Sequence, residues 1–164
     1  MNIRIGLGND THRLSPEKGY LTLGGIQIPS DHVIIAHSDG DLVLHALSDA
    51  ILGAIGANDI GELFPDNLEK TKNMSSVEIL DAALKLMKEK GYRVNNVDIV
   101  LELEEPKIAP YKTKIRENLA RLLDIDISCV GFKGKTGEKV DAVGEKRAIK
   151  ATCVVLLKGE KDEQ

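Results

Sequence analysis

Histidines and carboxylates gather in two short segments of this chain. The first contains Asp10 and His12, and the second is the run from Ala36 to His45, which also contains His37. Side chains two residues apart in an extended segment point the same way, so Asp10 and His12 can present an oxygen and a nitrogen to one point. With His45 they form an Asp, His, His set, which catalytic zinc sites use because a fourth position stays open for substrate. Imidazole ligands favour zinc over magnesium, so we expect zinc or another divalent ion at this site.

The helix predicted to carry His45 also carries Asp41 and Asp49, four residues to either side on the same face. A ligating histidine normally donates its other ring N–H to a carboxylate, and either aspartate could accept it. Each residue also has an ordinary explanation: His45 as a core or interface histidine, Asp41 as a helix cap and Asp49 as a solvated residue. Together they interrupt an otherwise very apolar helix, so the sequence favours metal binding.

A second candidate site is the run Lys133-Gly134-Lys135-Thr136-Gly137-Glu138-Lys139. Lysines, a hydroxyl and flexible backbone N–H groups suit a diphosphate, and Glu138 suits a hard cation such as magnesium that bridges phosphate oxygens. On the pattern alone, an ordinary charged hairpin turn is the better explanation. The sequence has no Walker A or Rossmann glycine pattern, and Gly6-x-Gly8 is too short to count as one.

These segments need a fold that brings them together, and the hydrophobic pattern predicts alternating strands and helices. A capping box at Ser75–Glu78 marks one helix start. The expected strands are 3–7, 21–28 (interrupted at Gly24-Gly25), 97–103, 130–135 and 148–157, and the expected helices are 39–57, 75–91 and 111–123. This order indicates an α/β (α+β) fold with a mixed four-stranded sheet, helices on one face and a small N-terminal hairpin.

The bulk composition limits the class of protein. The 164 residues are 42% hydrophobic with a net charge of −4, which predicts a single domain over 1–158 and a polar tail over 159–164. The acidic balance argues against a nucleic-acid partner. No apolar run approaches a membrane span, and the N-terminus reads directly into a strand, so we expect a cytoplasmic protein with no membrane partner. Cys129 and Cys153 lack metal-type spacing and are expected to be reduced, buried thiols.

The candidate residues belong to longer runs with a recognisable pattern. These runs are Arg4–Leu14 (Arg-Ile-Gly-x-Gly-x-Asp-x-His-Arg-Leu), Leu23–Pro29, Ala36–Asp41, Asp59–Asp66, Asn96–Asp98 and Pro106-Lys107. On them the chain resembles the 2-C-methyl-D-erythritol 2,4-cyclodiphosphate synthase family, over almost its whole length. The His-Ser-Asp-Gly-Asp and Asp-Ile-Gly-x-Leu-Phe-Pro-Asp blocks are the most specific parts of the resemblance.

The resemblance implies an enzyme of the non-mevalonate isoprenoid pathway. Such an enzyme converts 4-diphosphocytidyl-2-C-methyl-D-erythritol 2-phosphate to the cyclic 2,4-diphosphate and releases CMP, as a phosphorus–oxygen lyase. The 2-phosphate oxygen attacks the β phosphorus of the same molecule, while zinc and a magnesium or manganese ion screen charge and hold the groups in line. The resemblance also implies a homotrimer with each active site between neighbouring subunits.

The resemblance further implies functional residues by their positions in this sequence. Zinc is expected on Asp10, His12 and His45, and magnesium or manganese on Glu138 with Thr136 nearby. The expected catalytic residues are Thr136, Glu138, His37 and Asp49. The expected substrate contacts are His37 and Ser38 on a mobile loop, Asp59 and Gly61 at the sugar, Leu103, Lys107, Ile108 and Ala109 in the cytosine pocket, and also Phe64, Asp66, Lys135 and Thr136.

The chain departs from the common family pattern near its end. Lys135 and Gly137 replace two hydroxyls of a Thr-Thr-Thr run, while Thr136 and Glu138 remain. The usual Gly-Arg-x-Glu-Gly becomes Gly144-Glu145-Lys146-Arg147-Ala148. In the family this second segment lines the central channel of the trimer, so the resemblance does not extend to an isoprenoid diphosphate bound there.

Two other functions fit the same residues. A zinc phosphohydrolase would use the trio on a different ester and would release inorganic phosphate instead of CMP and a cyclic diphosphate. A metal-binding or structural module would bind no nucleotide, and His45→Ala would lower only its thermal stability. Product analysis tests the first of these hypotheses, and nucleotide binding tests the second.

Overall fold

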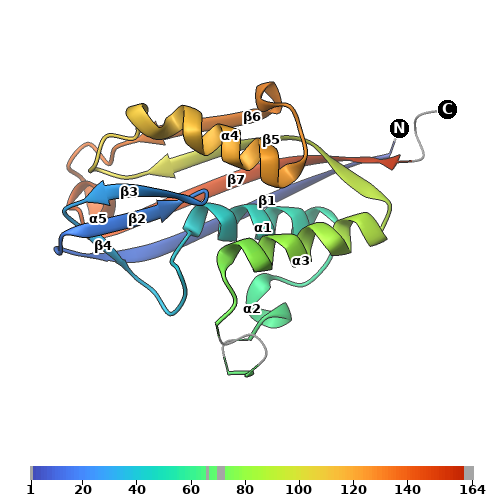
Figure 1. Ribbon diagram of the computed structural model, residues 1–164, viewed down its shortest axis with the longest axis horizontal. Helices are drawn as coiled ribbons and strands as arrows, with labels where there is room; N and C mark the ends of the chain where they lie inside the picture. Colours follow the sequence, from blue (N-terminus) through green and yellow to red (C-terminus); the bar gives the residue numbers. More distant parts are fainter. Residues whose placement is uncertain (1, 66, 70–72, 161–164) are drawn as a thin grey trace.

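The computed structural model describes residues 2–65, 67–69 and 73–160 as a sheet, a separate hairpin and a layer of helices (Figure 1). The strands are β1 (Ile3–Ser15), β2 (Gly19–Leu23), β3 (Ile26–Ser30), β4 (Val33–Ile35), β5 (Tyr92–Glu102), β6 (Val130–Lys135) and β7 (Ala148–Gly159). The helices are α1 (Leu42–Ala54), α2 (Ile60–Leu63), α3 (Ser76–Glu89), α4 (Lys112–Leu123) and α5 (Asp141–Gly144), with 3-10 turns η1 (Ala109–Tyr111) and η2 (Ile127–Cys129). In the described part of the chain, no helix is long and apolar enough to cross a membrane.

The main sheet has five strands in the order β4-β1-β7-β5-β6. β5 and β6 are parallel and the other neighbours are antiparallel. The mixed sheet is therefore confirmed, but the expected number of four strands is wrong. β1 continues to Ser15, well past Leu7 where the apolar alternation stops, and its far end pairs with β4. A three-residue edge strand is too short to be predicted from alternation.

The predicted small hairpin is confirmed as β2 and β3, which form their own two-stranded antiparallel sheet. Gly24 and Gly25 make its turn with φ of 60° and 80°, in the left-handed region that favours glycine. Their N–H groups donate to the Asp41 carboxylate at 2.9 and 2.7 Å. One aspartate thus ties the hairpin turn to the start of α1.

α1 begins three residues later than the periodicity predicts, because Asp41 is its N-cap and accepts the Leu44 N–H at 3.2 Å. N-cap side chains satisfy backbone donors that have no carbonyl partner in the first turn. Burial raises the pKa of Asp41 to about 6, although its three backbone donors favour the carboxylate. The cap interpretation of Asp41 is confirmed.

α1 lies directly against β1 because two glycines of the strand leave room for it. A Cβ on Gly6 would be 1.8 Å from the carbonyl oxygen of Ala50, and a Cβ on Gly8 would be 2.0 Å from that of Ala46. These distances are far inside van der Waals contact, so only glycine fits at either position. Gly6-x-Gly8 is therefore a packing feature, and it sets the distance between the strand and the helix that carry the candidate metal ligands.

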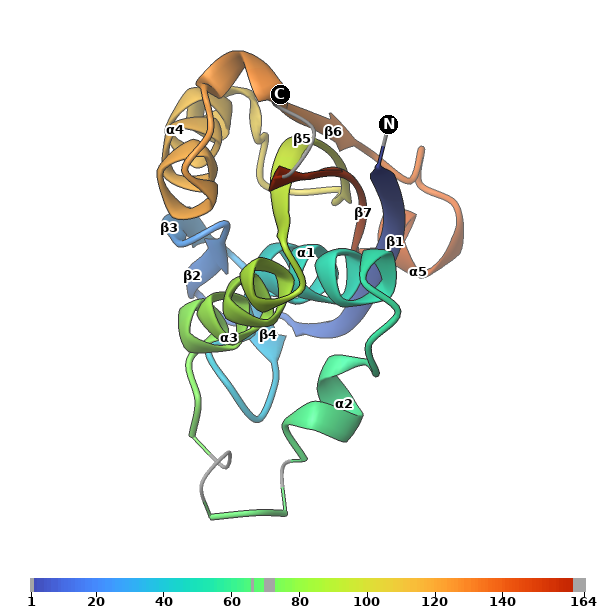
Figure 2. The same cartoon turned by 90° about the vertical axis from the view of Figure 1, so that its right-hand side faces the viewer.

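The helices α1, α3 and α4 cover one face of the sheet, as expected (Figure 2). The opposite face of β1 and β7 exposes apolar side chains: Ile3 at 50%, Ile5 at 72%, Leu7 at 64% and Val154 at 38%. Ile5 and Leu7 alternate with the glycines that face α1, so the apolar half of β1 points away from the core. Contiguous exposed apolar patches of this kind mark interaction surfaces.

Candidate metal centre and adjoining pockets

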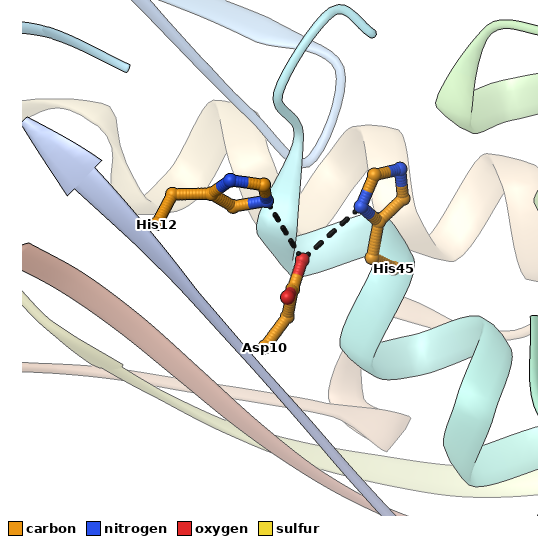
Figure 3. Close-up of side chains that lie close together, drawn as sticks. All are labelled: Asp10, His12 and His45. Atoms are coloured by element: carbon orange, nitrogen blue, oxygen red, sulfur yellow. Dashed lines mark hydrogen bonds and ion pairs between the residues drawn. The ribbon is translucent and has the colours of Figure 1, made fainter. Parts of the chain in front are cut away.

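The side chains of Asp10, His12 and His45 converge on one point (Figure 3). Asp10 and His12 lie on β1, and His45 lies in the first turn of α1. Asp10 Oδ2 is 2.9 Å from His12 Nε2 and 3.1 Å from His45 Nδ1. One ligand atom from each residue lies within 4.8 Å of the other two. The fold thus brings together the trio that spacing predicted.

The electrostatics of the trio favour an ionised carboxylate at its centre. Burial of Asp10 opposes ionisation, but hydrogen bonds and charge from His12 and His45 outweigh it and hold the pKa of this carboxyl far below its usual range. The hydrogen bond to Asp10 raises the pKa of His12 against the opposing effect of burial. Protons and a metal ion therefore compete for the same imidazole lone pairs.

His45 contacts the protein through its other ring nitrogen. His45 Nε2 lies 2.9 Å from Ser76 Oγ at the start of α3. The backbone of Ile35 in β4, the strand that the sequence did not predict, contributes to the raised pKa of His12. Outer hydrogen bonds of this type orient ligating imidazoles and direct the remaining nitrogen toward the metal.

The expectation that Asp41 or Asp49 accepts the outer N–H of His45 is wrong, since Ser76 makes that contact. Asp41 accepts backbone donors as the cap of α1, and the Asp49 carboxylate accepts the Ile60 N–H at 2.9 Å. Asp49 is half-buried, and burial raises the pKa of its carboxyl. Its hydrogen bond joins α1 to the start of α2.

The trio suits a divalent cation. With a proton on each outer nitrogen, His12 Nε2 and His45 Nδ1 direct lone pairs at an ionised Asp10 oxygen 2.9 and 3.1 Å away. Three such atoms repel one another unless a proton or a cation lies between them. Tetrahedral zinc with bonds of about 2.0–2.1 Å holds its ligand atoms about 3.3 Å apart, close to the 2.9 and 3.1 Å between the Asp10 oxygen and the two imidazole nitrogens.

A pocket of about 320 Å³ opens beside the trio. Its lining includes the trio and four expected substrate contacts, His37, Ser38, Gly61 and Phe64. Asp59, also expected at the sugar, is the N-cap of α2 and accepts the Glu62 N–H at 2.9 Å. Asp66 lies outside the described residues.

A second pocket, of about 230 Å³, lies where the parallel strands β5 and β6 end. The carboxyl ends of parallel strands are a common position for ligand sites. Six expected substrate contacts line this pocket: Leu103, Lys107, Ile108, Ala109, Lys135 and Thr136. Glu104 also lines it and accepts the Gly137 N–H at 2.9 Å, which holds the loop after β6 against the pocket.

Glu138 lies on the exposed loop after β6, and Thr136 Oγ1 donates to its carboxylate at 3.3 Å. Glu138 and Lys139 have φ of 50° and 60°, a strained conformation for residues with side chains. Glu138 is not a member of the trio, and the two pockets share no described lining residue. One chain therefore presents the two groups of expected residues in separate hollows.

Reasoning from the sequence missed Ser76 and Glu104. Ser76 lies within the predicted capping box, which is confirmed: Ser75 and Glu78 each accept the other's backbone N–H. That pattern indicates a helix start and nothing about His45. Both missed residues contact segments that are distant in the sequence, so no local spacing marks them.

The segment that departs from the family pattern forms ion pairs. Arg147 donates to Glu145 at 2.8 Å, and Lys146 donates to Glu105 at 2.7 Å. The order of the two charges is reversed relative to the common Arg-x-Glu, but an opposite-charge pair two residues apart remains.

The sequence matches one protein family over most of its length. The model of the YgbB family matches residues 3–158. The chloroplastic 2-C-methyl-D-erythritol 2,4-cyclodiphosphate synthase of Arabidopsis thaliana is 52% identical over 155 residues, which are 94% of this chain and 66% of that protein. The synthase of Rhodopirellula baltica is 47% identical over 154 residues, which are 94% of this chain and 92% of that protein. The chain thus spans just under two thirds of the plant relative and most of the bacterial one.

Solved structures agree with the sequence comparison. A 2C-methyl-D-erythritol-2,4-cyclodiphosphate synthase in its CDP-bound form superposes with a TM-score of 0.88 at 38% identity, over 94% of this chain and 100% of the other. The CDP complex of IspF from Plasmodium falciparum superposes with a TM-score of 0.86 at 40% identity, over 98% of each chain. The fold described above is therefore the fold of these CDP-binding proteins.

Proposed function

The chain belongs to the YgbB family, together with 2-C-methyl-D-erythritol 2,4-cyclodiphosphate synthases, and we propose that it catalyses their reaction. It converts 4-diphosphocytidyl-2-C-methyl-D-erythritol 2-phosphate to 2-C-methyl-D-erythritol 2,4-cyclodiphosphate and releases CMP, a step of the non-mevalonate isoprenoid pathway. The observation that carries the proposal is the convergence of Asp10, His12 and His45 beside a pocket lined by expected substrate contacts. The enzyme is a lyase that depends on zinc and on magnesium or manganese.

Asp10, His12 and His45 hold the zinc ion, which screens charge on the attacking 2-phosphate when it is bound. Two groups of residues around the adjoining pocket bind the methylerythritol phosphate. His37 and Ser38 on the loop before α1 contact its phosphate, while Asp59 and Gly61 at the start of α2 contact the sugar, with Phe64 and Asp66 completing the site. The lining of the pocket by His37, Ser38, Gly61 and Phe64 supports this assignment.

The second pocket binds the cytidine end of the substrate. Leu103, Lys107, Ile108 and Ala109 surround the cytosine, and Lys135 and Thr136 contact the diphosphate. Glu138 holds the magnesium or manganese ion, which neutralises phosphate charge when it is bound. Two observations support this assignment. The residues assigned to the cytosine and the diphosphate line one pocket, and Thr136 donates a hydrogen bond to Glu138.

The protein lowers the barrier mainly by holding two anionic groups in line. The attacking phosphate oxygen is already ionised, so no general base is needed. Holding both reacting groups of one molecule in place can be worth up to about 7–11 kcal/mol. His37 and Asp49 act by closing and shaping the pocket, since exclusion of water favours cyclisation over hydrolysis.

A homotrimer joins the two pockets between neighbouring subunits. Two observations support this part of the proposal. The trio and the diphosphate loop (residues 133–139) line different hollows of one chain, as expected if each active site combines residues of two subunits. The helix-free sheet face with Ile3, Ile5, Leu7 and Val154 offers an apolar surface for that copy.

The remaining assignments follow from the family and the composition. The partner is a small cytidine diphosphate substrate, with no nucleic acid and no membrane, and the enzyme acts in the cytoplasm. Residues 1–158 form one domain followed by a polar tail, and the tail begins after Gly159, later than expected, because Gly159 is the last residue of β7 and its N–H donates to the Asn2 carbonyl oxygen. Cellular fractionation and limited proteolysis test these two points.

Turnover of the cytidine diphosphate substrate with zinc and magnesium tests the function. CMP and the cyclic diphosphate are the expected products. Asp10→Ala and His45→Ala should abolish turnover and leave the trimer assembled, while His32→Ala, a histidine outside the trio, should keep both. Release of inorganic phosphate instead would identify a hydrolase, and failure to bind CDP or CMP would indicate a non-enzymatic module. A monomer in light scattering would exclude the shared site.

A further inference from the structure

We propose that Asp39 and Ser76 are positioning residues that hold the loop before α1 against the start of α3, so that His37 and Ser38 are in place before the substrate binds. The inference rests on the proposed function, which assigns His37 and Ser38 to the methylerythritol phosphate. Neither Asp39 nor Ser76 is among the described lining residues of the pocket beside the trio. Both act through the residues that do line it.

Two walls of this pocket come from segments that are distant in the sequence. One wall is the loop before α1, which supplies Ser38. The other is the segment around the start of α3, which supplies Met74 and Ile79. Asp39 directly follows Ser38, and Ser76 lies between Met74 and Ile79 in the chain. A bond between Asp39 and Ser76 therefore joins the two walls.

The Asp39 carboxylate makes this connection by accepting three hydrogen bonds. The Ser76 N–H donates to Oδ2 at 3.0 Å, and the Ser76 hydroxyl donates to Oδ1. The Asp41 N–H also donates to Oδ1, at 3.2 Å, which holds the carboxylate from its own end of the loop. Ser76 is fully buried, so its N–H would lose its acceptor without access to water if the loop moved away.

The place of Ser76 in α3 explains why this N–H needs a partner from another segment. Ser76 is the first residue of the helix, after the N-cap Ser75. The first N–H groups of a helix have no carbonyl partner inside it, and the Ser75 side chain accepts from Glu78 instead. Asp39 thus completes the capping of α3, and its negative charge is favourable at the positive end of the helix. The same contact stabilises the helix start and the loop.

The backbone of the loop connects Asp39 to the neighbouring pocket residue. Gly40 has a φ of 70°, in the left-handed region that favours glycine, and a Cβ there would lie 2.9 Å from Ile34 Cγ2. The Gly40 N–H donates to Ser38 Oγ at 3.2 Å. The hydroxyl assigned to the phosphate is therefore oriented by the stretch of chain that Asp39 anchors to α3.

Hydrogen exchange of the Ser76 N–H, measured by NMR with zinc present, tests the contact without turnover. The substitutions are made at Asp39, because Ser76 Oγ also lies 2.9 Å from His45 Nε2. Asp39→Ala should speed exchange of this N–H by roughly tenfold or more, because a hydrogen bond to a charged acceptor is lost. Asp39→Asn keeps one acceptor oxygen and should cause a smaller increase. An unchanged exchange rate in Asp39→Ala would overturn the proposal.

Kinetics and CDP binding test the consequence for the substrate. A loop that is in place for only a fraction of the time lowers the apparent affinity by that fraction, so Asp39→Ala should raise the KM for the cytidine diphosphate substrate by roughly tenfold with little change in kcat. The affinity for CDP, which lacks the methylerythritol phosphate, should stay the same. An unchanged KM, or an equal loss of CDP affinity, would contradict the positioning role.

Ser75→Ala is the matched control, because it weakens the same helix start and leaves the Asp39 contacts in place. It removes the bond from the Glu78 N–H, so it should lower the Tm and keep the wild-type KM. A raised KM in Ser75→Ala would show that a weaker helix start is sufficient and would contradict a specific role of Asp39. A wild type without turnover would refute the proposed function, while exchange of the Ser76 N–H would still decide whether Asp39 holds the loop to α3.

Discussion

The close contact between β1 and α1 links the stability of the fold to the geometry of the metal centre. Gly8→Ala places a methyl group 2.0 Å from the Ala46 carbonyl oxygen and 2.6 Å from the Ala50 nitrogen. Ordinary contact begins near 3.4 Å, so the clash with Ala46 requires the helix to move away by about 1.4 Å. His45 precedes Ala46 in the chain, and its ring would move with the helix.

This displacement should have two measurable effects. Overpacking costs about 1–3 kcal/mol, and we expect about 3 kcal/mol for Gly8→Ala because the clashing atoms are backbone and cannot rotate away. The shift also exceeds the tolerance of about 0.2 Å for a metal–ligand bond. Zinc affinity should therefore fall by at least roughly tenfold, since Asp10 and His45 would no longer meet at one ion.

Urea denaturation at one fixed protein concentration measures the free energy of unfolding, and chelator competition measures zinc affinity. Gly53→Ala in α1 is the matched control, because its Cβ would lie 4.0 Å from the Leu7 carbonyl oxygen, at ordinary contact distance. It should raise the free energy of unfolding by about 0.5–1 kcal/mol and leave zinc affinity unchanged. A Gly8→Ala protein with wild-type stability and zinc affinity would refute the idea that this glycine sets the geometry of the site.

Three more predictions concern the cap, the diphosphate loop and the open sheet face. Because the pKa of Asp41 is raised from 3.8 to about 6, the folded state holds this proton more tightly than the unfolded state does. As the pH rises from about 4 to about 6, the free energy of unfolding of the wild type should therefore fall relative to that of Asp41→Asn, and a rise would contradict this. Glu104→Ala should release the Gly137 N–H and so raise the magnesium concentration for half-maximal turnover several-fold. Glu104→Gln keeps an acceptor oxygen and should not change this concentration. Equal magnesium concentrations for Glu104→Ala and the wild type would exclude a role of Glu104 in holding the loop. Leu7→Lys should yield a monomer in light scattering that is folded by circular dichroism and shows no turnover in the activity assay. A trimer would exclude this face as the subunit contact.

Features that depend on neighbouring residues could be predicted from the sequence. Asp10 and His12 share one side of a strand because they are two residues apart, and the apolar spacing of 42–55 placed His45 on a helix. The capping box at Ser75 and the glycine turn of the small hairpin follow from equally local rules. The assignment of Glu138 and of the cytosine pocket came from family resemblance, because spacing alone favoured an ordinary turn.

Features that depend on contacts between distant segments needed the tertiary structure. The alternation of Ile5 and Leu7 predicted a strand, but only the packing of α1 on Gly6 and Gly8 shows that these apolar side chains face away from the core. The fifth strand, β4, forms because it pairs with the end of β1. Its three residues are too few to predict a strand from the sequence.

The same distinction holds at the metal centre. The sequence determined which residues can ligate an ion, because side-chain chemistry and spacing along one strand are local properties. It pointed to an aspartate beside His45, whereas the structure supplies Ser76 from α3, since helix packing brings that hydroxyl to Nε2. Packing also decided that the trio and the diphosphate loop lie in separate hollows. Residue types and local spacing thus determined the chemistry available, and long-range packing decided which groups meet.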